Sequence, residues 1–192
     1  MKAILMSLQP KWCERIATNE AGKKKTIEVR KTYPKEFLKE YFLASTFEPF
    51  KVYIYCTQGK DILAVSRYSD KSVFLWNESD VDRYNIDMVR NGKIIGEFIC
   101  DNIDLYAYGD LSYPTPAYDG DPSFCDCGEG YWITVGDLKK TQLTYEELCA
   151  YGKSKALYGW HISDLVIYDE PKQLSDFGVE RAPQSWFYVN EK

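Results

Sequence analysis

The chain has 192 residues, of which 45% are hydrophobic and 16% aromatic, so it is long enough for one large domain with a substantial core. No apolar run approaches the ~18 residues that a membrane span needs, and the first residues lead directly into structure instead of a signal peptide. These features exclude a membrane-spanning protein and predict a cytoplasmic one. The six cysteines are then expected to be reduced thiols: Cys13, Cys56, Cys100, Cys125, Cys127 and Cys149.

The charge is unevenly distributed along the chain. The formal net charge is -5, yet residues 1–40 hold ten Lys/Arg and five Asp/Glu. Residues 101–137 contain no basic residue at all. Because phosphate responds to the local field within about 10 Å, the acidic total does not exclude a nucleic-acid ligand. It does argue against a protein that coats duplex DNA non-specifically.

The first quarter of the chain predicts alternating strands and helices. Residues 2–8 read as a strand, and Pro10 stands at the preferred first position of a helix. Residues 19–25 form a polar turn before a second strand over 26–30, and residues 50–56 read as a further strand. Pro34 is expected to open another short helix, whose apolar stripe would contain Phe37, Leu38, Tyr41 and Phe42.

The remaining segments are mostly strand-like. Residues 57–91 are irregular and polar and read as an insertion, whereas residues 92–108 resume the strand pattern with a break after Asp101. A long loop follows at 109–130, of a length that is often functional. Thr144 and Glu147 form a capping box for a helix that Gly152 would end, and strands are expected over 157–169 and 185–189.

This order of elements predicts an α+β domain, a small mixed barrel, closed or half-closed, with helices packed outside. No Gly-rich dinucleotide fingerprint or phosphate-binding loop is present, which disfavours an enzyme built around those cofactor sites. We expect no cofactor.

The strand T-I-E-V-R carries the strongest site signal. Alternate residues share a face, so if Ile27 and Val29 enter the core, Glu28 and Arg30 face a cleft or solvent, with Lys25 at the mouth of the strand. A glutamate beside an arginine can fix the guanidinium and present its donors to a phosphate or a base edge. The alternative is a surface cross-strand ion pair, which is worth little.

The stretch L-Q-P-K-W followed by K-T-I-E-V-R-K resembles the ASCH domain family within the PUA-like superfold. The hallmark of that family is G-x-K-x-x-E-x-R; Lys25, Glu28 and Arg30 match it, whereas Gly22 lies one residue early. Three later stretches, 92–98, 157–177 and 183–189, are similar to phage- and Firmicutes-type ASCH proteins. The resemblance implies a single PUA-like domain over 1–192, with insertions at 57–91 and 109–130.

The resemblance also implies that the motif lines a cleft that binds single-stranded RNA or a modified nucleotide. Aromatic side chains would stack on bases and the basic ones would follow the backbone. Packing in the core is the alternative for each tryptophan. Besides Lys25, Glu28 and Arg30, the candidate binding residues are Gln9, Trp12, Trp160, His161 and Trp186.

A hydrolase is the first alternative function. One branch of the family is similar to amidohydrolases that act on acetylated cytidine through a K-T-x-T arrangement, in which Lys25 and Thr26 match but Glu28 replaces the second threonine. Glu28 would then act as a general base beside Lys25, and cleavage of RNA is also open. His161, the only histidine, is a further catalytic candidate or a structural residue.

The second alternative is a protein-interaction module. The acidic region 101–137 reads as a solvated surface, a lid, or a contact for a basic protein partner. Within it, Cys125 and Cys127 form a C-x-C pair that is tighter than the usual zinc spacing, so we expect free thiols and no bound metal.

Overall fold

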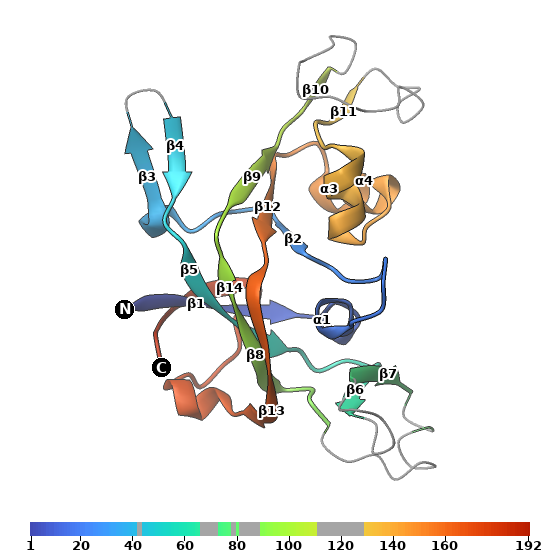
Figure 1. Ribbon diagram of the computed structural model, residues 1–192, viewed down its shortest axis with the longest axis vertical. Helices are drawn as coiled ribbons and strands as arrows, with labels where there is room; N and C mark the ends of the chain where they lie inside the picture. The colour runs from blue at the N-terminus through green and yellow to red at the C-terminus, as the bar shows by residue number, and fades with distance from the viewer. Residues whose placement is uncertain (42–43, 66–72, 78–79, 81–88, 111–128) are drawn as a thin grey trace. The chain divides into compact units, whose positions relative to one another are not determined.

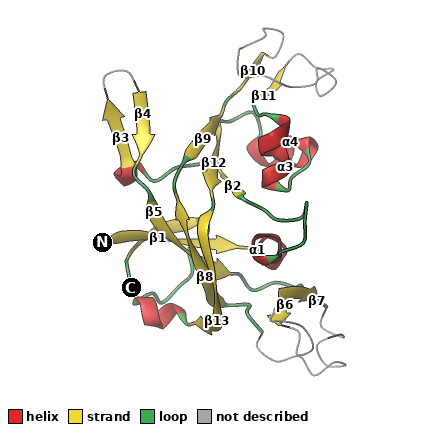
Figure 2. Cartoon of the chain, in the orientation of Figure 1, coloured by secondary structure: helices red, strands yellow, loops and turns green. Residues whose placement is uncertain are grey.

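The computed structural model describes residues 1–41, 44–65, 73–77, 80, 89–110 and 129–192. Strands dominate these residues (Figure 2). The chain divides into two compact units, each assembled from separated segments. The first unit comprises residues 1–24, 50–100 and 163–192, and the second comprises residues 25–49 and 101–162. The prediction of a single domain with two insertions stays a prediction.

A five-stranded sheet forms the centre of the first unit (Figure 1). Its strand order is β13-β8-β5-β1-β14, with β1 parallel to β5 and every other neighbour antiparallel. Strand β1 is buried at every position from Ala3 to Leu8, as expected for an apolar run between two neighbours. The bounds are β1 (Lys2–Leu8), β5 (Phe50–Cys56), β8 (Lys93–Cys100), β13 (Ser163–Lys172) and β14 (Trp186–Asn190).

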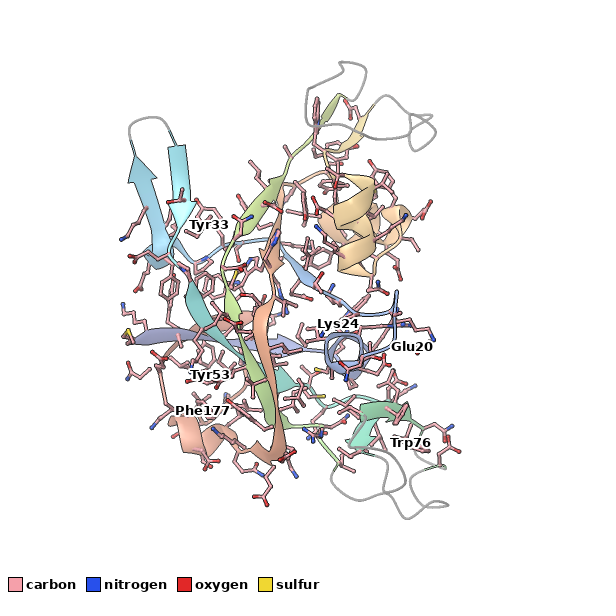
Figure 3. All side chains as sticks on the ribbon, viewed as in Figure 1. Glu20, Lys24, Tyr33, Tyr53, Trp76 and Phe177 are labelled. Atoms are coloured by element: carbon pink, nitrogen blue, oxygen red, sulfur yellow. The ribbon has the colours of Figure 1, made fainter. Side chains whose placement is uncertain are left out.

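Shorter elements complete the first unit. Helix α1 (Pro10–Ala17) starts with its proline, as predicted, and buries Cys13 and Ile16. The 3₁₀ helix η3 (Leu174–Phe177) brings Phe177 against Tyr53, with 4.7 Å between ring centroids (Figure 3). Strands β6 (Ile62–Val65) and β7 (Val73–Trp76) pair within the segment that was expected to be irregular. Cross-strand packing of their apolar residues outweighs the polar surroundings in the sequence.

A three-stranded antiparallel sheet, in the order β2-β12-β9, organises the second unit. Its strands are β2 (Ile27–Arg30), β9 (Ile103–Tyr106) and β12 (Leu157–His161). Helices α3 (Val135–Thr141) and α4 (Tyr145–Gly152) contribute Leu138 and Leu148 to a core that also contains Val29 and Leu157. Two hairpins complete this unit: β3 (Leu38–Tyr41) with β4 (Ala44–Phe47), and β10 (Tyr108–Asp110) with β11 (Glu129–Tyr131).

The prediction of a helix after Pro34 is wrong beyond the first turn. Only the 3₁₀ helix η1 (Lys35–Phe37) forms, and the chain then enters β3. The backbone groups of Leu38–Tyr41 pair with Ala44–Phe47, so hairpin pairing overrides the helical spacing of the apolar residues. Phe42 lies outside the described residues.

Helix α3 was missed by the sequence analysis, whereas α4 was predicted correctly. Thr134 caps α3 by accepting a hydrogen bond from the backbone nitrogen of Asp137, and the T-x-x-D spacing was the available signal. The predicted capping box of α4 is present between Thr144 and Glu147. Gly152 is its last helical residue, and Lys153 takes the left-handed cap position.

The α+β class is confirmed. Among the described strands, β13 and β14 are the two edges of the five-stranded sheet, so this sheet is open and the closed barrel stays a prediction. No helix within the described ranges combines the length and apolar character that a membrane crossing requires.

Candidate functional site

Lys25, Glu28 and Arg30 form a buried charged triad in the second unit. The Glu28 carboxylate lies between the two cations: Oε2 is 3.4 Å from Lys25 Nζ, and Oε1 is 3.1 Å from Arg30 Nε. The side chains of Lys25, Glu28 and Arg30 are only 2%, 7% and 10% exposed. Charges are rarely buried to this degree unless they are paired, and here one carboxylate serves two cations.

Burial of this triad corrects the expectation for β2. All four residues of the strand are buried, those with polar side chains included. The core positions of Ile27 and Val29 are confirmed, but Glu28 and Arg30 do not face solvent. The alternative of a surface ion pair is therefore wrong. Whether one face or both faces of a strand are buried depends on what packs against it. The period-two alternation in the sequence does not reveal this.

Lys25 is held at the end of α3. Its Nζ donates to the carbonyl oxygen of Thr141, at 2.5 Å, where the negative end of the helix favours a cation. Burial lowers the pKa of Lys25, and the nearby Glu28 carboxylate opposes this shift. The lysine run thus divides by environment: Lys23 and Lys24 are exposed, whereas Lys25 is among the largest fully buried side chains. Figure 3 labels Lys24.

Strand register decides which neighbours share the face of the triad. Glu28 is opposite Trp160, and Arg30 is opposite Tyr158, so these pairs project from one face of the sheet. Trp160 is fully buried. Of the two roles considered for Trp160, stacking on a base and packing in the core, its burial fits packing in the core. The structure thus brings Trp160 together with Lys25, Glu28 and Arg30 in one unit.

His161 projects from the opposite face, because it follows Trp160 in the same strand. Its Nε2 lies 2.6 Å from Asp104 Oδ2, and Asn102 Nδ2 donates to Oδ1 of the same carboxylate. His161 and Glu28 therefore project from opposite faces of this sheet. Asp104 also lines a pocket of about 250 Å³ whose lining includes Trp132 and Asp137.

The other predicted binding residues belong to the first unit. Gln9 is exposed and Trp12 is half-buried, with Lys11 Nζ 4.6 Å from its ring centroid. Trp186 is half-buried and packs edge to face against Tyr188.

The second unit contains an aromatic row that was not predicted from the sequence, which consists of Tyr158, Tyr33 and Phe47. The ring centroids of Tyr33 and Tyr158 are 4.8 Å apart, and those of Tyr33 and Phe47 are 5.7 Å apart. All three side chains are half-buried. In L-Y-G-W-H, the spacing of Tyr158 and Trp160 was the available signal, since both residues have the same strand parity.

No group of three or more metal-ligating side chains occurs among the residues that the structure describes. Residues 111–128 of the acidic region 101–137, Cys125 and Cys127 among them, lie outside those residues. The described cysteines are free thiols, namely Cys13, Cys56, Cys100 and Cys149.

Neither a protein-family model nor a curated protein sequence matches the chain. Among solved structures, the chain is similar to a serine-to-alanine mutant of ZmASCH from Zymomonas mobilis, with a TM-score of 0.50 at 14% identity, over 98% of this chain and 89% of that one. A tyrosine-to-phenylalanine mutant of the same protein gives 0.49 at 15% identity, over 100% and 92%. The first of these likenesses shows an ASCH-like fold for this chain.

Proposed function

We propose that this ASCH-like chain binds single-stranded RNA or a modified nucleotide through Lys25, Glu28 and Arg30, in the PUA-like arrangement that the motif implies. The observation that carries the proposal is the buried triad itself. Replacing buried ion pairs by apolar residues is often neutral or stabilising, so stability alone gives little reason for this arrangement. Buried and perturbed charged groups are instead typical of functional sites.

The charges in the triad fit an oxygen-rich, anionic ligand. Lys25 and Arg30 carry two positive charges against the single negative charge of Glu28 when all three are ionised. Glu28 Oε1 lies 3.1 Å from Arg30 Nε, so the guanidinium is paired with a neighbouring negative charge. Such a guanidinium can donate two parallel hydrogen bonds to a phosphate or to the acceptor edge of a base.

The test compares two variants that each remove one positive charge, Arg30→Gln and Lys2→Gln. Lys2 is exposed in the first unit, so its variant controls for the loss of long-range attraction. We expect Arg30→Gln to weaken binding of a short single-stranded RNA at least ~10-fold, and Lys2→Gln by less than ~3-fold. Fluorescence anisotropy at one salt concentration measures both, with circular dichroism to verify folding. Equal losses would remove Arg30 from the site.

A hydrolase at the same site is the second candidate, and the environment of Lys25 favours it. A buried lysine whose pKa is lowered, 3.4 Å from a carboxylate, resembles the acid–base pairs that enzymes use. Glu28→Gln separates the two functions. In an enzyme with Glu28 as base, turnover of acetylated cytidine or of RNA falls by roughly 10²–10⁴-fold while binding survives. For a binding protein we expect no wild-type turnover of either substrate.

A further inference from the structure

The aromatic row lies on the same face of the second unit's sheet as Arg30. Tyr158 is directly opposite Arg30 on β2 and directly opposite Leu105 on β9, so the three side chains form one line across the sheet. Tyr33 tilts against Tyr158 at 58°, and Phe47 of β4 packs edge to face against Tyr33. Figure 3 marks Tyr33 near the β3–β4 hairpin.

The aromatic row and Leu105 form an apolar surface that is partly open to solvent. Leu105 is 59% exposed, and the rings of Tyr158, Tyr33 and Phe47 are only half-buried. Rings in tilted and edge-to-face contact hold each other in position, so their exposed surfaces are presented without a large ordering cost.

Positive charge borders the aromatic row. Residues 30–35 read R-K-T-Y-P-K, with three basic and no acidic side chains around Tyr33. Lys35 is exposed and Arg30 lies beside Tyr158 across the strand pair, whereas Lys31 places its Nζ 4.7 Å from the ring centroid of Tyr151 in α4. A row of rings edged by cations complements a ligand with flat apolar faces on a phosphate backbone.

We infer that Tyr158, Tyr33 and Phe47 form a stacking platform for an unpaired base of single-stranded RNA, with an adjacent phosphate beside Arg30. The inference rests on the proposed function. It assigns the base of the ligand to the aromatic row, whereas the triad would contact phosphate. A duplex does not fit, because its base faces are stacked inside the helix and only unpaired bases expose them to aromatic side chains.

The test uses two probes of equal length, a single-stranded RNA and the same backbone made abasic. We expect wild type to bind the base-bearing probe more tightly, and Tyr158→Ala to weaken that binding by about 5- to 140-fold. Binding of the abasic probe should change little. Tyr158→Phe keeps the ring and should retain the preference for the base-bearing probe. Tyr158→Leu keeps apolar volume without a ring and should lose that preference, which provides the test if the alanine variant does not fold.

The matched control is Tyr188→Ala, since Tyr188 is also half-buried and packs edge to face against another ring in the first unit. It should leave the preference for the base-bearing probe intact. Arg30→Gln should weaken both probes alike, because it acts on phosphate. If Arg30→Gln loses affinity while Tyr158→Ala and Tyr158→Leu keep the preference, the platform is refuted and the proposed function stands; the row would then suit a protein contact. If wild type binds neither probe, both ideas fall.

Discussion

Replacing Glu28 with glutamine tests whether the charged triad is buried in solution. The change keeps the shape of the side chain and removes its charge. In the structure, Glu28 contacts Lys25 Nζ at 3.4 Å and Arg30 Nε at 3.1 Å, with every side chain at most 10% exposed. The variant therefore leaves two buried cations without their shared carboxylate. Breaking a buried pair in this way costs about 3–5 kcal/mol.

An exposed ion pair of the same chain gives the matched control. Glu20 lies 2.6 Å from Lys23 Nζ, with the two side chains 58% and 51% exposed. Solvent-exposed pairs contribute about 0–1 kcal/mol, so Glu20→Gln should change the free energy of unfolding by less than ~1 kcal/mol. Urea denaturation followed by circular dichroism at neutral pH measures both variants under the same conditions.

A double variant separates lost pairing from other effects. In Lys25→Met/Glu28→Gln the buried cation is removed together with its carboxylate, so the loss should be smaller than the sum of the two single losses by at least ~1 kcal/mol. If Glu28→Gln costs no more than Glu20→Gln, and the double variant is additive, then the triad is solvated and our account of β2 is refuted.

Three further predictions follow from other features of the chain. Gly152→Ala places a Cβ on the Tyr131 hydroxyl; we expect a loss of about 1–3 kcal/mol from overpacking, and a melting temperature at or above that of wild type would contradict it. Burial lowers the pKa of Lys25 in the folded state. Between that pKa and the unfolded value of about 10.4, the unfolded chain binds more protons at Lys25 than the folded chain does. The free energy of unfolding therefore increases as the pH rises through this range. Wild type should therefore gain stability relative to Lys25→Met as the pH is raised toward about 10.4 in paired urea titrations, and a difference that shrinks would show the opposite shift. Finally, the C-x-C spacing of Cys125 and Cys127 predicts no stoichiometric zinc, which elemental analysis of the purified protein checks; one zinc per chain would overturn it.

Local sequence signals were sufficient for several elements. The apolar run that became β1 and the proline that starts α1 predicted those elements correctly. The capping box of Thr144 and Glu147 predicted the start of α4. These signals act within a few residues, through backbone dihedral preferences and hydrogen bonds near in sequence, so they can be read without knowing the fold. The K-x-x-E-x-R spacing named Lys25, Glu28 and Arg30, which contact one another in the structure, and their role in binding stays a prediction.

Other features depended on partners that are distant in sequence. Leu38–Tyr41 has helical spacing, yet it forms β3 because β4 is available for pairing. Lys25 is separated by 116 residues from the carbonyl oxygen of Thr141 that it contacts, and His161 by 57 residues from Asp104. Strand register alone put Tyr158 beside Arg30 and turned His161 to the other face.

The sequence by itself therefore determined which residues carry charge and aromatic surface, and where most strands and two of the helices begin. Tertiary structure decided how those residues are solvated. Alternation in T-I-E-V-R is equally compatible with a solvent-facing ion pair and a buried one, and only packing on both faces of β2 distinguishes them. The distinction matters physically, because an ion pair worth little in water becomes, once desolvated, a group whose charges must all be satisfied.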